Sequence, residues 1–115
     1  LEIEEMGLEI GERPVVQIPV MNRGNIHCRP EGQASVHDAK GTVVAWGTLQ
    51  RGMPAVPGRV ERFLVPVSGA PLGPGRYQLQ ASLTCHSVAQ LPSQFTGAQT
   101  GELDDAGHWQ PITTR

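Results

Sequence analysis

The sequence predicts an all-β protein folded as an antiparallel β-sandwich of about seven strands. The clearest signal lies between Tyr77 and Cys85, where apolar or aromatic residues alternate strictly with polar ones. A period of two is typical of a strand with one buried face and one face in water. The 115 residues also include 14 Gly and 10 Pro, which interrupt helices and favour a chain with many turns.

The length of the chain limits the number of domains, and its charge argues against a nucleic-acid partner. A chain of 115 residues can bury one hydrophobic core and is short for two. We assign residues 1–103 to a single sandwich domain and residues 104–115 to a flexible C-terminal tail. The formal net charge is −2, and no cluster of Lys and Arg indicates a nucleic-acid partner. No apolar run is long enough for a membrane-spanning helix. Without an initiator Met or a signal peptide, the chain is expected to be a fragment of a longer protein.

The first strands are predicted from the alternation within the N-terminal residues. Residues 1–12 alternate apolar and acidic side chains, as expected of an edge strand whose Glu residues discourage association with other sheets. Residues 16–22 form a second strand, with apolar residues at positions 16, 18 and 20. Pro19 lies on the opposite face and cannot donate a backbone hydrogen bond, so we expect a bulge or a sheet edge there.

A hairpin and a further strand follow. Residues 33–37 and 42–47 form the two arms of the hairpin, because Asp38 and Gly41 are residues that turns favour. Residues 60–67 form the next strand, again with alternating apolar residues. The inward faces of all these strands and of the Tyr77 strand define the predicted core, which consists of Val16, Ile18, Val20, Val36, Phe63, Val65, Leu79, Ala81 and Leu83.

The chain beyond the Tyr77 strand has no clear period. Phe95 and Leu103 suit a last strand, whereas Gly97 and Gly101 weaken it. One expectation is an irregular final strand that folds back within its own domain. The other is an open edge beside the Tyr77 strand, which would accept a strand from another chain or exchange one in a swapped homodimer.

The residues before the longest strand predict a tight corner. Pro74 fixes its own φ angle, and Gly75 accepts a positive φ. Because Tyr77 follows at once, its ring can lie under the corner and its hydroxyl can donate a hydrogen bond back to the backbone near Leu72. This arrangement is the tyrosine corner of β-sandwich proteins.

Four turn motifs occur in an order that resembles a known family. They are Asn-x-Gly-Asn, Val-x-Asp-x-x-Gly, Val-Pro-Gly and Leu-x-Pro-Gly-x-Tyr, at residues 22–25, 36–41, 56–58 and 72–77. The sequence from about residue 10 to residue 87 is similar to the immunoglobulin-like domains of bacterial cell-envelope proteins. These include pilus-chaperone-like proteins and surface proteins that interact with WxL-type cell-wall components. The resemblance implies an extracytoplasmic, non-enzymatic module for adhesion, assembly or spacing, without a cofactor.

The two cysteines are candidates for a disulfide. Cys28 follows the second strand and Cys85 ends the Tyr77 strand, and in a sandwich these two ends lie at the same pole. The alternative is a pair of free buried thiols, as in a cytosolic protein. A zinc site with His27 and His86 would need both Cys-His pairs to converge, although adjacent residues on extended backbone point to opposite faces. We therefore expect no metal.

The two tryptophans are the candidates for ligand contact. Trp46 suits the core of a small sandwich, and it could also lie exposed on the hairpin and stack on a sugar ring. Trp109 in the tail is the second candidate. The acidic pairs Glu4-Glu5 and Asp104-Asp105 lack the spacing of a calcium loop and are interpreted as solvated charge.

These residues and motifs leave three functions, and an enzyme comes last among them, because no acid, base and nucleophile set stands out. The first is a structural or interaction module of a bacterial surface or periplasmic protein. It would bind a protein partner, or neighbouring domains of its parent protein, through an edge strand or loops. The second is a carbohydrate-binding module that binds cell-wall glycan with an exposed tryptophan.

Overall fold

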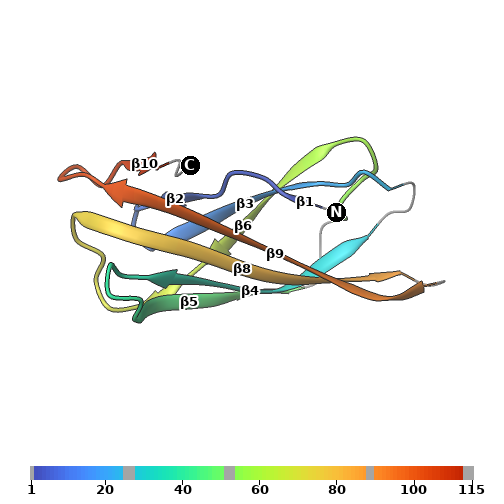
Figure 1. The fold of residues 1–115 in the computed structure, drawn as a ribbon, viewed down its shortest axis with the longest axis horizontal. Helices are drawn as coiled ribbons and strands as arrows, with labels where there is room; N and C mark the ends of the chain where they lie inside the picture. Colours follow the sequence, from blue (N-terminus) through green and yellow to red (C-terminus); the bar gives the residue numbers. More distant parts are fainter. Residues whose placement is uncertain (1, 25–27, 51–53, 88–89, 113–115) are drawn as a thin grey trace.

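The computed structural model describes residues 2–24, 28–50, 54–87 and 90–112. For residues 86–87 and 90–93 it describes only the backbone. These residues form two antiparallel sheets that pack face to face (Figure 1). The predicted all-β sandwich is confirmed. The described part of the chain contains no helix with the length and apolar content that a membrane crossing requires.

The first sheet is built around β3 (Val15–Met21). One side of β3 pairs along its whole length with β6 (Val60–Pro66). The other side pairs with two short N-terminal strands, β1 (Glu2–Ile3) and β2 (Gly7–Glu9). The predicted N-terminal edge strand is therefore present as two pieces with a gap between them.

Pro19 explains the gap. The N–H of Glu4 donates to the carbonyl oxygen of Pro19 at 2.8 Å, so the backbone of Pro19 faces the N-terminal segment. In an antiparallel ladder the N–H and C=O of one residue point to the same side, and Pro has no N–H to offer there. The sequence predicted a bulge or an edge at Pro19. The strand that carries Pro19 is central, so the edge is not found. The register of the N-terminal segment does shift by one residue opposite Pro19, between Ile3↔Val20 and Gly7↔Gln17, as a bulge requires.

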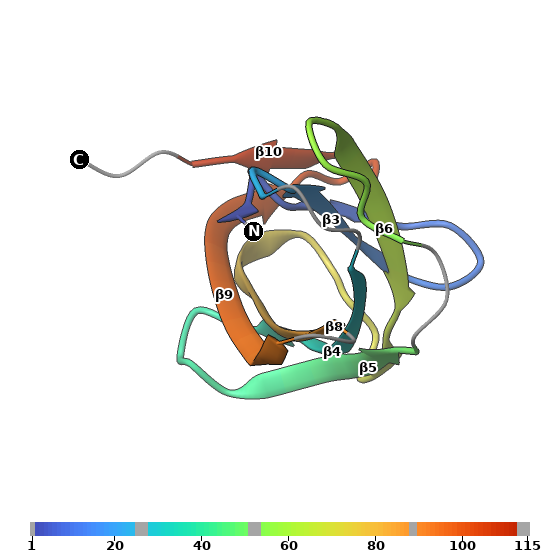
Figure 2. The same ribbon diagram turned by 90° about the vertical axis from the view of Figure 1, so that its right-hand side faces the viewer.

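The second sheet has six strands, and the longest of them lie at its centre. Its order is β10 (Trp109–Pro111), β9 (Gln90–Leu103), β8 (Gly75–Ser87), β4 (Arg29–His37), β5 (Val43–Leu49) and β7 (Ser68–Gly69). The predicted hairpin is the β4–β5 pair, and the Tyr77 strand is β8. Viewed along the long axis, β9 curves away from β8 toward β1 of the first sheet, so the sandwich is nearly closed on that side (Figure 2).

The end of the chain differs most from the sequence prediction. Strand β9 pairs with β8 from Leu103 opposite Gly75 to Gln90 opposite Ser87, so the edge of β8 is not open and this chain supplies its own last strand. Residues 104–115 were expected to be a flexible tail. Within them, β10 pairs with β9 as a third hairpin arm, while residues 113–115 lie outside the described residues.

Two glycines on the inner face of β9 explain why the prediction failed there. A Cβ added to Gly97 would lie 2.8 Å from Cγ2 of Ile3, and one added to Gly101 would overlap the ring of Trp109. Both glycines therefore make room for side chains from β1 and β10. They are requirements of packing and do not interrupt the strand.

The core between the sheets matches the prediction. All nine predicted core residues are buried. The core also contains residues outside the predicted set, namely Met6, Leu8, Ala34, Ala45, Ala55, Val67 and Leu103.

The corner before β8 has the expected geometry, because the hydroxyl of Tyr77 donates to the carbonyl oxygen of Gly73 at 2.8 Å.

The β4–β5 and β9–β10 hairpins are each closed by a turn that begins with an Asp residue. Oδ1 of Asp38 accepts hydrogen bonds from the N–H groups of Lys40 and Thr42, both at 2.9 Å, and Gly41 has φ of 84°. The turn between β9 and β10 repeats this construction, with Asp104 as the acceptor and Gly107 at φ of 80°. The second turn has the same Asp-x-x-Gly spacing as the first, a local signal that the sequence prediction of a flexible tail missed.

Candidate functional site

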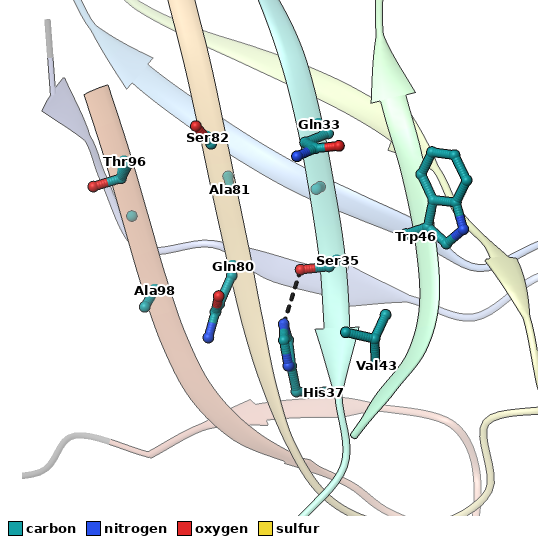
Figure 3. A pocket seen from close by; sticks show the side chains of 12 residues that line it. Gln33, Ser35, His37, Val43, Trp46, Gln80, Ala81, Ser82, Thr96 and Ala98 are labelled. Atoms are coloured by element: carbon teal, nitrogen blue, oxygen red, sulfur yellow. Dashed lines mark hydrogen bonds between the residues drawn. The ribbon is translucent and has the colours of Figure 1, made fainter. Parts of the chain in front are cut away.

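The outer face of the six-stranded sheet carries a shallow groove of about 710 Å³ (Figure 3). The groove crosses four strands, β9, β8, β4 and β5. Its lining consists of Gln33, Ala34, Ser35, His37, Val43, Trp46, Gln80, Ala81, Ser82, Thr96, Gly97 and Ala98.

Strand register explains why a sheet surface is hollowed at this place. One row of cross-strand neighbours runs from Trp46 through Ser35 and Gln80 to Ala98. Short outward side chains thus lie beside long ones, and Ser82 in the next row is again short. The long side chains form the rim and the short ones the floor. No single segment of sequence contains this pattern, because each row takes one residue from each strand.

Trp46 lies on the rim and is 57% exposed. The interpretation that placed Trp46 in the core is therefore wrong, and the alternative of an exposed aromatic on the hairpin applies. On the inner face of β5, the two residues next to Trp46 are Ala45 and Gly47, and a Cβ on Gly47 would overlap the backbone carbonyl of Pro66. Because β6 passes so close, no side chain fits at position 47 on the inner face, whereas Trp46 next to it lies on the outer face. Val43, exposed to 51%, adds a second apolar group on this side of the groove.

His37 and Ser35 form the polar centre of the groove. Nε2 of His37 lies 2.9 Å from Oγ of Ser35, and Nδ1 lies 3.4 Å from the carbonyl oxygen of Gly41. In the tautomer protonated on Nδ1, the ring donates to Gly41 and accepts from Ser35. The pair has the residue types of a nucleophile and a base, but the described lining holds no carboxylate to orient the imidazole. Backbone N–H groups in the middle of a sheet are committed to the ladder, so they do not provide an oxyanion hole.

The described lining of the groove contains no Asp, Glu, Lys or Arg. Charges lie at the ends of the sheet. Arg76 and Glu102 form an exposed ion pair of 3.4 Å near the start of β8, and Arg29 and Glu31 lie near the start of β4. The centre of the face is therefore neutral, amide-rich and hydroxyl-rich, with one large aromatic side chain at its border.

Trp109 does not contribute to this groove. Its side chain is half-buried on the inner side of β10, where it packs against the core and lies over Gly101. Its Nε1 is buried and has no hydrogen-bond partner among the described residues. Of the two candidate contact residues, Trp46 is thus exposed on the outer face, whereas Trp109 packs against the core.

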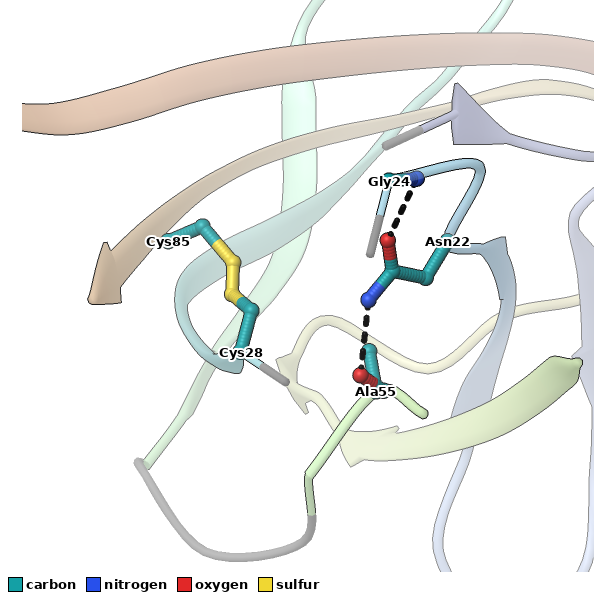
Figure 4. The surroundings of a disulfide bond; sticks show 5 residues. All are labelled: Asn22, Gly24, Cys28, Ala55 and Cys85. Atoms are coloured by element: carbon teal, nitrogen blue, oxygen red, sulfur yellow. Dashed lines mark hydrogen bonds between the residues drawn. A yellow bond between two sulfur atoms is a disulfide. The ribbon is translucent and has the colours of Figure 1, made fainter. Parts of the chain in front are cut away.

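Cys28 and Cys85 lie at the opposite end of the sandwich and form a disulfide, with their Cα atoms 5.8 Å apart (Figure 4). The backbone of Cys28 pairs with that of Ala55. Beside this pair, the buried side chain of Asn22 donates to the carbonyl oxygen of Ala55 and accepts from the N–H of Gly24, both at 2.9 Å.

The metal alternative receives no support from this end of the molecule. Both thiols are used in the disulfide, while His27 and the side chain of His86 lie outside the described residues. No group of three or more His, Cys, Asp or Glu side chains gathers anywhere in the described ranges.

Asp104 of the acidic pair 104–105 has a structural role. The hydrogen bond from the backbone N–H of His108 lowers the pKa of its carboxyl group below the ordinary value, and the N–H of Ala106 and the charge of His108 act in the same direction. The carboxylate of Asp104 thus accepts hydrogen bonds from the backbone of its own turn. This use explains the residue without a bound cation.

No protein-family model matches the chain, and no curated protein is significantly similar to it.

Proposed function

We propose that this domain is a non-catalytic interaction module of a bacterial cell-envelope protein and binds its partner on the outer face of the six-stranded sheet. The observation that carries the proposal is the exposed Trp46 at the border of an uncharged groove. Exposed aromatic side chains and a lack of charge at the centre are what distinguish binding surfaces from the rest of a protein surface.

The outer face is favoured over a sheet edge. The sequence suggested an edge strand or loops as the binding element, but segments of the chain itself occupy part of both edges of the larger sheet. β7 pairs with β5 at Ala45 and Trp46, and β10 pairs with β9 from Gly101 to Leu103. Short covering strands of this kind hinder the addition of a foreign strand at the positions that they pair with.

Two observations support the envelope location and the family. The Cys28–Cys85 disulfide is compatible with an oxidising compartment outside the cytoplasm. In the order of an immunoglobulin-like sandwich, β3 and β6 share one sheet, while β4, β5, β8 and β9 share the other. The corner at Tyr77 agrees with the motif on which the resemblance rests.

The groove supports a binding role over a catalytic one. Ser35 and His37 contact each other, but neither an orienting carboxylate nor free backbone donors accompany them in the described lining. A Ser–His contact without these groups orients two side chains on a surface and does not activate a nucleophile.

Sedimentation with bacterial envelope fragments tests the proposal. The wild-type domain should pellet with the fragments, and Trp46→Ala should remain largely in solution. Leu64→Ala is the matched control, because Leu64 is exposed to 54% on β6 in the other sheet. Circular dichroism and thermal unfolding verify that both variants are folded. Equal retention of wild type and Trp46→Ala would refute the assignment of the binding face.

A further inference from the structure

We infer that the groove binds a neutral polysaccharide chain, with the indole of Trp46 as the stacking platform for a sugar ring. This inference rests on the proposed function, because it names the chemical class of the partner on the same face. Three properties of the described groove carry it: an exposed indole, a lining that both donates and accepts hydrogen bonds, and the absence of Asp, Glu, Lys and Arg.

The indole provides the apolar contact that a sugar needs. A pyranose ring has a face made of C–H bonds, and this face packs against the flat surface of an aromatic side chain. Trp46 exposes more than half of its side chain, and Val43 extends the apolar border. Trp offers this area at low conformational cost, since only two χ angles are fixed on binding.

The remaining lining matches sugar hydroxyls. Amide and hydroxyl side chains both donate and accept hydrogen bonds, as sugar hydroxyls do. Gln80 donates to Gln78 at 2.8 Å, and Ser82 accepts from Gln94 at 2.9 Å. These bonds hold the polar side chains in place while the amide oxygen of Gln80 and the hydroxyl proton of Ser82 remain able to bond a ligand.

Because the described lining has no Asp, Glu, Lys or Arg, we expect it to favour neutral over charged polysaccharides. A uronic-acid or phosphate-bearing chain would bring anionic groups against a described lining that has no Lys or Arg to pair with them. A neutral chain avoids the free-energy cost of placing unpaired anionic groups against this lining. The groove volume of about 710 Å³ lies within the range of small-ligand sites and spans several strands, which suits a short run of sugar rings.

A protein partner fits the groove less well. The fully buried centre of a protein interface is apolar, and each polar group that it covers needs a bonding partner. The described lining here consists mainly of hydroxyls, amides and small residues, with aromatic area only at one border. A flexible glycan chain satisfies such groups with its own hydroxyls.

Titration with soluble oligosaccharides tests the inference. The probes are cellohexaose, mannohexaose and chitohexaose, with oligogalacturonate as the anionic comparison. Binding is followed by calorimetry on the wild type and by indole fluorescence in a Trp109→Phe background, where Trp46 is the one fluorescent indole. If Trp109→Phe does not fold, calorimetry alone decides.

We expect saturable binding of at least one neutral probe and weaker or no binding of oligogalacturonate. Trp46→Ala should lower the affinity by about tenfold or more, as for a central aromatic contact, and Leu64→Ala should leave it unchanged. Trp46→Phe should retain part of the affinity. Absence of binding by every neutral probe at millimolar concentration would overturn the inference, as would binding that Trp46→Ala leaves intact.

The envelope assay separates this inference from the proposed function. If protease treatment of the fragments abolishes Trp46-dependent retention while periodate oxidation of their glycans does not, the partner is a protein, and the glycan inference fails alone. If retention does not depend on Trp46 at all, both fail.

Discussion

The indole of Trp109 lies directly on Gly101, and a methyl group at position 101 would overlap the ring. Ile3 lies over Gly97 in the same manner, four residues earlier on the inner face of β9. The two ends of the chain, β1 and β10, thus pack on one strand at positions where that strand has no side chain. This packing holds β1 and β10 against β9.

Gly101→Ala should therefore lower the free energy of unfolding, because the added Cβ forces the indole of Trp109 out of its site. We expect a loss of about 1–3 kcal/mol, as for overpacked cores, measured by urea denaturation. In the double variant with Trp109→Ala, the combined loss should be smaller than the sum of the two single losses. Strict additivity would show that the two positions do not interact.

Tyr77→Phe removes only the hydroxyl that donates to the carbonyl oxygen of Gly73. Because the ring remains, the expected loss is that of one hydrogen bond, about 0.5–1.5 kcal/mol. Thermal unfolding of the two proteins under the same conditions measures it. An unchanged midpoint would mean that the corner does not depend on this bond.

The Cys28–Cys85 disulfide closes a loop with a sequence separation of 57 residues. On the chain-entropy model, such a cross-link stabilises the folded state by about 4 kcal/mol. Reduction should lower the unfolding midpoint by a matching amount, and alkylation should add mass to both thiols only after reductant. If both thiols alkylate without reductant in denaturant, the protein was isolated without the bond.

Asp104 makes stability depend on acid pH. The pKa of its carboxyl group is lower in the folded protein than the ordinary value of 3.8, so ionised Asp104 stabilises the fold above that pH. The contribution disappears as the pH falls through the folded-state pKa. Asp104→Asn should therefore be less stable than wild type at neutral pH, and the difference should shrink in acid. Asp105→Asn is the control, and an equal pH profile of all three proteins would contradict this role.

The sequence was sufficient to predict features that depend on residues close together in the chain. Alternation along a single strand identified the buried face of β8, including Leu79 and Leu83, and turn residues identified the corner at Tyr77. These features depend on neighbours a few residues away, which a sequence displays directly.

The sequence was insufficient where the decisive contact comes from a distant segment. Gly97 and Gly101 resemble strand breakers until Ile3 and Trp109 are seen to occupy the space above them. Trp46 faces outward, and its inward neighbour Gly47 lies against the backbone of Pro66 on β6, an approach that nothing near Trp46 in sequence records. The groove itself arises from cross-strand register, which a single sequence does not contain.

Site-specific photocrosslinking of the protein to bacterial envelope fragments tests the proposed binding face most directly. A photoreactive amino acid at position 46 lies on the border of the groove, and the same amino acid at position 64 lies on the outer face of the other sheet. Irradiation should produce a discrete adduct from position 46 and none from position 64. An adduct from position 64 with none from position 46 would contradict the assignment of the partner to the groove face.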